Sequence, residues 1–245
     1  RKLRTTHAIL ARDLSGQTLG AFARALHAHA MLFEAEQAYL AAARLAQGPG
    51  AYEYLHLAGL AASESNPTRA TKHLAQAASL RPNSPATQML RGRMLESLAR
   101  LSEAESCFQA VVQYQPSSHA FLGLGRIKLA RGDAKAALQD LNEAQRLQPD
   151  HREVHEARAR CLNQLGNTQA SRAAARRAGD LAQPTPFPDP FQIQIASENV
   201  SSEARLHRGA ALAQAGQTAA AIENFEGVLE VRRDHIEALD YLALL

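Results

Sequence analysis

Residues 117–149 read SSHAFLGLGRIKLARGDAKAALQDLNEAQRLQP, and this stretch decides the fold. Apolar residues recur at spacings of three and four in its first half and again in its second half, as on one face of an α-helix. Gly132-Asp133 separates the halves and is typical of a tight turn. Pro149 closes the stretch, because proline cannot continue a helix. The stretch therefore predicts a hairpin of two short helices.

The hairpin pattern recurs along the chain, mostly at intervals of 33 to 35 residues. Its mark is a small residue followed four positions later by a bulky one, so that two helices approach closely and the bulky side chain fills the gap to the next hairpin. Turn glycines and closing prolines keep the same register. The pairs are Ala35 and Tyr39, Ala70 and Leu74, Ala104 and Phe108, Ala137 and Leu141, and Ala221 and Phe225, with punctuation at Pro82, Pro116, Gly166-Asn167 and Gly216-Gln217.

These residues resemble the pattern of the tetratricopeptide repeat family. The fourth unit matches with Phe121, Leu124-Gly125, Ala137, Leu141, Ala144 and Pro149, and the second with Tyr54, Leu57-Ala58, Ala70, Leu74, Ala77 and Pro82. The resemblance covers roughly residues 16–183 and 202–245. It implies an all-α fold, a right-handed superhelical solenoid of about six antiparallel helix pairs and a partial seventh. Ser171, Ala175 and Arg233 depart from the pattern, which predicts locally weaker units.

The repeat register predicts four regions. Residues 1–15 are expected to form an N-terminal capping helix or the end of a preceding repeat, residues 16–183 five units, and residues 202–245 a sixth unit and the first helix of a seventh. Residues 184–201 form a proline-rich insertion with four prolines, which favours extended backbone. Because it also carries Phe187 and Phe191, we expect it to pack on the side of the superhelix. The alternatives are a docking strand for a partner or a ligand for the chain's own groove.

Arginine recurs at one position of the first helix in four of the six units, the first, third, fourth and fifth. In the family this position faces the concave groove, so the resemblance implies a ladder of guanidinium groups suited to carboxylates or phosphates of an acidic partner. The alternative is that these arginines are simply solvated, and Glu96 and Glu153 on the same helices would neutralise part of the charge. The candidate groove residues are Arg24, Arg93, Arg126 and Arg160, with His119 and Gln164 flanking them.

Composition and motifs argue against several other functions. The net charge is only +3 and no block of like charge stands out, so nucleic acid is not expected as a partner. No apolar run is long enough to insert into a membrane. His151 and His155 have a four-residue spacing, but one falls at a turn and the other at a packing position, so neither a metal nor a cofactor is expected. Cys107 and Cys161 are expected to be free, buried thiols, and no catalytic motif is present.

The sequence therefore predicts a non-catalytic scaffold that binds a protein or peptide segment in its concave groove. Two alternatives stay open: a module for self-association through the C-terminal end, or a recruitment domain of a larger, multi-domain protein. The excess of arginine over lysine is typical of a GC-rich bacterial genome, so we expect a bacterial protein of the cytoplasm or the periplasm. No signal peptide is visible in the sequence. The identity of the partner does not follow from the repeat pattern.

Overall fold

The computed structural model describes residues 15–181, 187–198, 202–231 and 235–244, and within these ranges every regular element is a helix. The first ten α-helices form five antiparallel hairpins. They are α2 (Gly16–Ala28) with α3 (Leu32–Ala46), α4 (Ala51–Ser63) with α5 (Pro67–Leu80), α6 (Pro85–Ser97) with α7 (Leu101–Tyr114), α8 (Ser118–Ala130) with α9 (Ala134–Leu147), and α10 (Arg152–Gln164) with α11 (Thr168–Asp180). A short 3₁₀ turn, Gly48–Gly50, joins the first two hairpins. The prediction for residues 1–14 lies outside the described residues.

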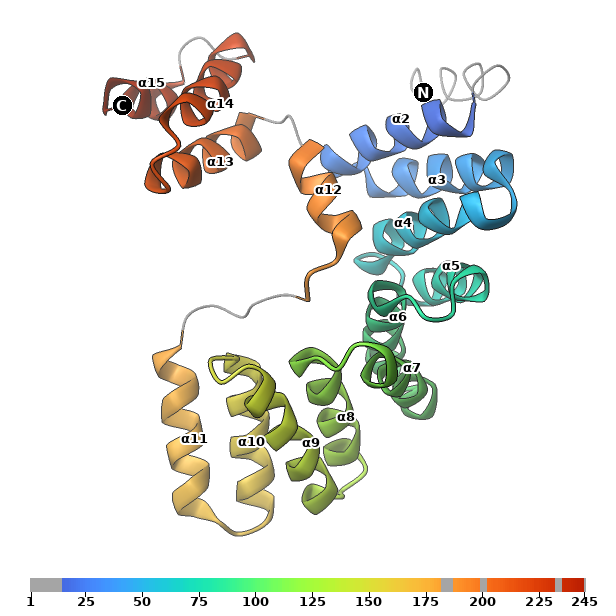
Figure 1. Ribbon diagram of the computed structural model, residues 1–245, viewed down its shortest axis with the longest axis vertical. Helices are drawn as coiled ribbons and strands as arrows, with labels where there is room; N and C mark the ends of the chain where they lie inside the picture. The colour runs from blue at the N-terminus through green and yellow to red at the C-terminus, as the bar shows by residue number, and fades with distance from the viewer. Residues whose placement is uncertain (1–14, 182–186, 199–201, 232–234, 245) are drawn as a thin grey trace.

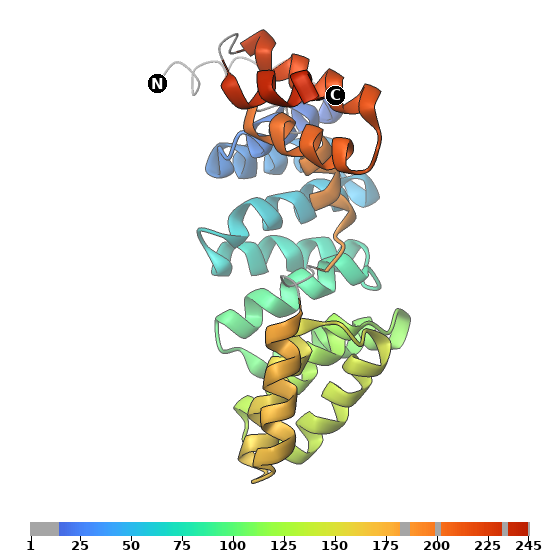
Figure 2. The ribbon, with the colours of Figure 1, turned by 90° about the vertical axis from the view of Figure 1, so that its left-hand side faces the viewer.

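The hairpins stack along the long axis of the molecule into a curved solenoid (Figure 1). Each hairpin packs on the next, and the first helices of successive hairpins also touch, since α4 contacts α6, α6 contacts α8, and α8 contacts α10. These first helices therefore share one continuous surface on the inner side of the curve. Figure 2 shows the same stack from the side, with the helices one above the other. The prediction of an all-α solenoid is confirmed.

After the fifth hairpin come α12 (Pro190–Glu198), α13 (Ser202–Gln214), α14 (Thr218–Val231) and α15 (Ile236–Leu244). Helix α12 lies on the inner side of the curve and packs against α2, whereas α13 and α14 form a further hairpin on which α15 packs (Figure 1). The aromatic rings of Phe225 on α14 and Tyr241 on α15 stack with centroids 4.9 Å apart.

The small and bulky residues of the repeat form the core between hairpins. The best example is Phe108 on α7, which is 1% exposed. A Cβ atom added at Gly92 on α6 or at Gly123 on α8 would lie 2.7 or 2.6 Å from the Phe108 ring, so the ring sits between the first helices of two hairpins. The other predicted pairs are buried in the same way: Ala35 and Tyr39, Ala70 and Leu74, Ala137 and Leu141, and Ala221 and Phe225.

The turns inside four of the first five hairpins use a left-handed residue, and the turn between α4 and α5 does not. Gly132 has φ of 85° and Gly166 has φ of 77°, as the turn prediction requires, and each is followed by an Asp or Asn that caps the next helix. In the third hairpin the corresponding position is Ala99, with φ of 56°. An alanine in this conformation costs roughly 1 kcal/mol because its Cβ crowds the following carbonyl.

We therefore expect opposite effects from exchanging alanine and glycine at these two turns. Ala99→Gly should raise the free energy of unfolding by about 0.5–1 kcal/mol, and Gly132→Ala should lower it by about 1 kcal/mol. Urea denaturation followed by circular dichroism would measure both changes. A stabilising effect of Gly132→Ala would contradict the assignment of the turns.

Candidate functional site

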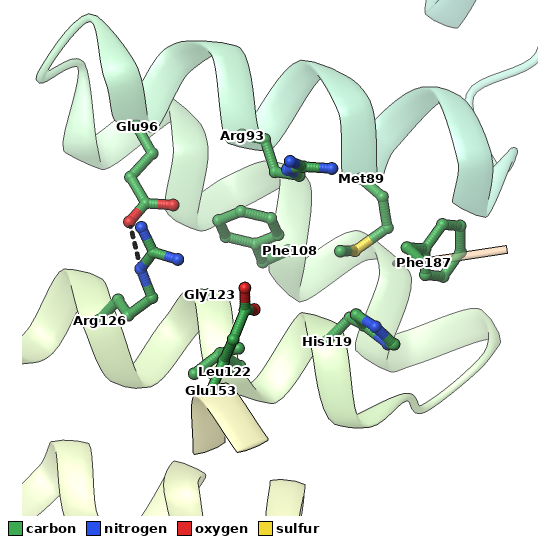
Figure 3. Close-up of a pocket in the computed structure, with 10 residues that line it drawn as sticks. All are labelled: Met89, Arg93, Glu96, Phe108, His119, Leu122, Gly123, Arg126, Glu153 and Phe187. Carbon is green, nitrogen blue, oxygen red and sulfur yellow. Dashed lines mark ion pairs between the residues drawn. The ribbon is translucent and has the colours of Figure 1, made fainter. Parts of the chain in front are cut away.

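The inner surface of the solenoid carries an open pocket of about 280 Å³ between α6, α8 and α10. Apolar groups form its floor, among them Met89, Phe108 and Leu122. Charged side chains surround this floor, and Figure 3 shows how they lie: Arg93 and Glu96 come from α6, Arg126 from α8, and Glu153 enters from α10. A pocket with an apolar floor and charged walls suits an amphipathic side chain of a bound segment.

The charges in this pocket partly balance one another. Arg126 Nε lies 2.8 Å from Glu96 Oε1, and the Arg126 side chain remains half exposed. Burial raises the pKa of Glu96, although the positive charges of Arg126 and Arg93 oppose part of that rise. Arg93 is exposed and Glu153 is partly exposed. The pocket is therefore not a purely cationic groove.

The structure brings together only part of the predicted arginine ladder. Arg93, Arg126 and His119 all line this pocket. Arg24 lies in another part of the stack, where its guanidinium is 3.7 Å from the Glu53 carboxylate. Arg160 and Gln164 are exposed on α10 and are not among the residues that line the pocket.

Residues 187–198, here called the inner segment, lie against the first helices next to this pocket. Asp189 Oδ2 is 2.9 Å from His56 Nε2 on α4, although 133 residues separate the two positions, and both side chains are buried. The other ring nitrogen, His56 Nδ1, lies 3.0 Å from Thr87 Oγ1 on α6. Tyr52 continues the network, with its hydroxyl 2.9 Å from the Thr87 hydroxyl. This buried polar network fixes the inner segment to two neighbouring hairpins.

Asp189 also starts helix α12. Its Oδ1 accepts a hydrogen bond from the backbone N–H of Phe191 at 3.0 Å, and Pro190 takes the first helical position, where its missing N–H leaves no bond unmade. Burial alone would raise the pKa of Asp189. The hydrogen bond and the charge of His56, together with backbone N–H groups of Phe191 and Gln192, outweigh burial and leave the pKa below its ordinary value.

Two aromatic side chains hold the inner segment on either side of Asp189. The Phe191 ring lies 4.6 Å from the His56 ring and 6.0 Å from the Tyr52 ring, measured between centroids. The Phe187 ring meets the His119 ring edge to face at 5.7 Å, and it closes one side of the pocket. Contacts of this kind add roughly 0.5–1.5 kcal/mol each to the burial of the rings.

The prediction that the proline-rich insertion is extended and packs on the side of the superhelix is wrong for the inner segment. Residues 190–198 form α12, because Pro190 stands at the one place in a helix that tolerates proline and Asp189 caps the helix. The segment lies on the inner surface, against α2, α4 and α6. The alternative kept open from the sequence, a ligand for the chain's own groove, describes this arrangement.

The sequence analysis did not find Tyr52, His56, Thr87 or Asp189 as site residues. One signal was available, because His56 interrupts an otherwise apolar run on α4 and a buried histidine needs hydrogen-bond partners. The sequence did not identify Asp189 as the partner of His56, because repeat periodicity says nothing about which residue of an insertion reaches the groove. The aromatic residues on both sides of Asp189 were visible, but no repeat position corresponds to them.

A second histidine beside the pocket gives the fold a pH dependence. His151 is 1% exposed, its Nδ1 lies 2.7 Å from Ser118 Oγ, and its ring lies 4.5 Å from that of His119. Burial, with smaller contributions from the charges of His119 and His155, lowers the pKa of His151 from 6.5 to about 4. Because the unfolded state then takes up a proton that the folded state does not, stability falls as the pH drops from about 6.5 towards 4.

The pKa shift of His151 corresponds to a loss of about 2 kcal/mol between pH 8 and pH 5. We expect His151→Gln to reduce the pH dependence of the free energy of unfolding by about this amount. Denaturation curves at pH 8 and pH 5 would measure it, with His29→Gln, at an exposed histidine, as the control. Equal pH dependence in the wild-type chain and His151→Gln would contradict the assignment.

The other sequence-based candidates have packing roles. His155 is buried and its Nε2 lies 2.7 Å from the carbonyl oxygen of Pro149. Cys107 and Cys161 are free and buried, as predicted, and burial raises the pKa of both thiols. Within the described ranges, no three His, Cys, Asp or Glu side chains gather as a metal site would require. None of the described helices has the length and apolar character needed to cross a membrane.

Comparison with known proteins identifies the fold. A family model described as tetratricopeptide repeat matches residues 97–149 and 122–184. No curated protein matches the sequence. Among solved structures, a MamA protein is similar with a TM-score of 0.61 at 14% identity, over 69% of this chain and 98% of that one. PilF of Pseudomonas aeruginosa is similar with a TM-score of 0.58 at 14% identity, over 94% of this chain and 97% of that one.

At this level of identity the two structures show the fold alone. The family match, in contrast, covers α7 to α11 and includes the fourth unit, whose sequence pattern is the clearest. Together with the left-handed turns and the buried small and bulky pairs, it identifies residues 97–184 as tetratricopeptide repeats, and the other hairpins share their fold.

Proposed function

We propose that this protein is a non-catalytic scaffold that binds a segment of another protein on the inner surface of its solenoid. The observation that carries the proposal is the inner segment itself. Residues 187–195 lie on the first helices of the hairpins through one buried ion pair and two aromatic contacts. The same surface thus has the shape and the polar groups to accept a peptide.

The pocket beside Phe187 supports a preference for a segment that combines an apolar side chain with a carboxylate. The floor of Met89, Phe108 and Leu122 suits the apolar group. Arg93 is an exposed cation at the same pocket, while Glu96 already pairs with Arg126. An acidic partner residue is therefore expected near Arg93 rather than along a continuous ladder from Arg24 to Arg160.

The chemistry of the described side chains fits binding better than catalysis. The thiols of Cys107 and Cys161 are buried and their pKa values are raised, so both stay protonated at neutral pH and are poor nucleophiles. His151 and His155 are held by Ser118 and by the carbonyl of Pro149.

Selection from a library of random peptides displayed on phage would test the proposal. The target is the wild-type chain, and the enriched peptides are then measured against an Arg93→Glu, Arg126→Glu variant. The control is a second variant, Arg44→Glu, Arg172→Glu, with the same change in charge. It replaces two exposed arginines that lie on the second helices α3 and α11, away from the pocket. We expect at least tenfold weaker binding to the first variant and unchanged binding to the control. Equal binding to all three proteins would overturn the pocket as the binding site.

Self-association is the second candidate function, and the surface of α15 favours it. Ile236 is 72% exposed and Leu239 is 47% exposed, so apolar side chains that would pack in a core face outwards. Sedimentation velocity over a hundredfold range of concentration would test this proposal. A mass that rises with concentration in the wild-type chain but not in Leu239→Glu supports self-association, and a constant monomer mass overturns it.

A further inference from the structure

The contacts of the inner segment define a recognition site with its own chemistry. The site consists of Tyr52 and His56 on α4, Thr87 on α6 and His119 on α8. From these helices the site offers a ring nitrogen for a carboxylate and aromatic faces on either side of it. The inner segment, which occupies the site, supplies Asp189 at the start of a helix. Phe187 lies two residues before this aspartate and Phe191 two residues after it.

The polar part of the site favours a carboxylate, because one Asp189 oxygen pairs with His56 Nε2 and the other accepts from the backbone N–H of Phe191, whereas an amide has a single oxygen. His56 is fully buried, and both its ring nitrogens have partners, Asp189 on one side and the Thr87 hydroxyl on the other. His56 Nε2–H donates to the carboxylate, and Nδ1 forms the second hydrogen bond with the Thr87 hydroxyl, in which either group can be the donor. Replacing the carboxylate by an amide removes the charge and turns an N–H₂ group, itself a donor, toward one of the two N–H groups that the carboxylate accepts from.

The inner segment leaves part of the surface around it unfilled. A second pocket, of about 640 Å³, opens beside it and is lined by Tyr52 and Ser118 on the helices and by Phe187 and Phe191 on the segment. On α12 the side chain of Ile193 is 59% exposed. Ile195 of the same helix is buried in the core cluster of the first two hairpins. Around His56 the segment is held by Phe187, Asp189 and Phe191, and a competing segment with these three groups would replace the contacts at that site.

We propose that this site binds a partner segment of the form aromatic-Pro-Asp-Pro-aromatic, in which the aspartate starts a short helix, and that the inner segment is a built-in competitor for it. This inference rests on the proposed function and names the ligand chemistry of one part of the inner surface. A tethered ligand acts at an effective concentration of the order of millimolar. A partner with the same groups therefore binds weakly until the inner segment leaves.

The probe for the test is a fluorescein-labelled peptide with the sequence of residues 187–198, FPDPFQIQIASE, measured by fluorescence anisotropy. Three full-length chains are compared: the wild type, a released variant with Phe187→Ala and Phe191→Ala, and the released variant with His56→Gln added. We expect the released variant to bind the peptide with a Kd at least tenfold below that of the wild type, and His56→Gln to remove this gain. A peptide carrying Asp189→Asn is expected to bind the released variant at least tenfold more weakly.

A released variant of native helicity that fails to bind the peptide, or that binds the Asp and Asn peptides equally, would overturn the inference. If the released variant does not fold, the chain with Asp189→Asn alone replaces it, because it keeps both rings and removes only the charge. That chain is expected to bind the wild-type peptide more tightly than the wild-type chain does, and equal binding would overturn the inference. The phage selection tests the pocket by substituting Arg93 and Arg126, which are not changed in this experiment. Its outcome therefore distinguishes failure of the proposed function from failure of this site.

Discussion

Replacing Phe108 with alanine is expected to lower the free energy of unfolding by about 3–4 kcal/mol. The ring is 1% exposed and lies between Gly92 on α6 and Gly123 on α8, so its removal leaves a cavity between two hairpins. The ring lies directly against the backbone of both helices at these glycines. The helices could fill the space of a missing ring only by moving their backbones. In a solenoid each hairpin is stabilised by its neighbours. The substitution therefore weakens the packing of the third hairpin on the fourth.

Urea denaturation of Phe108→Ala would measure this loss, with Tyr114→Ala as the control. Tyr114 is on the same helix α7 but is 59% exposed, so its removal deletes an aromatic ring without opening a core cavity. We expect a change within about 0.5 kcal/mol for the control. A loss below about 1 kcal/mol in Phe108→Ala would show that the ring does not join the two hairpins.

The second large effect is expected where the inner segment meets the solenoid. His56→Ala leaves the buried Asp189 carboxylate without its partner, which typically costs about 3 kcal/mol or more. The loss cannot exceed the free energy with which the inner segment docks, because a detached segment exposes the carboxylate to water. We therefore expect a fall of about 2–3 kcal/mol in the free energy of unfolding.

A double-mutant cycle with His56→Ala and Asp189→Ala would test whether the two residues act together. The double variant should be little less stable than either single variant, which gives a coupling energy of about 2 kcal/mol. A matched cycle uses Arg100→Ala and Glu103→Ala, an exposed ion pair at the start of α7 with atoms 2.7 Å apart, and should give a coupling energy below about 1 kcal/mol. Additive losses at His56 and Asp189 would contradict their contact.

The sequence predicts the solenoid well because its physical cause is local and repeated. Ala104 and Phe108 stand at fixed positions in a hairpin, and the ring of Phe108 meets Gly92 of the same hairpin and Gly123 of the next one. The turn at Gly132 follows from the need for a left-handed residue. Each of these features depends only on residues within one or two repeats, so periodicity is enough to find them.

The inner segment could not be predicted in this way. The contact between His56 and Asp189 joins residues 133 positions apart, and the distance depends on how far the solenoid curves before the chain returns. The prolines of the insertion favoured extended backbone, but Pro190 is compatible with the first turn of α12 once Asp189 caps it. Arg24 and Arg160 share the repeat position of Arg93 and Arg126 but stand on other hairpins, outside the pocket, and Arg24 lies 3.7 Å from the Glu53 carboxylate instead.

Hydrogen exchange followed by mass spectrometry tests the occupancy of the inner surface most directly. The backbone N–H of Ile193 donates to the carbonyl of Asp189 at 3.0 Å, and the amides of α12 are protected only while that helix is formed. We expect peptides covering residues 187–198 to exchange much more slowly in the wild-type chain than in His56→Ala, with α4 and α6 protected in both. Exchange of residues 187–198 at the rate of an unstructured peptide in the wild-type chain, with α4 and α6 protected, would contradict an inner surface filled by the chain's own segment.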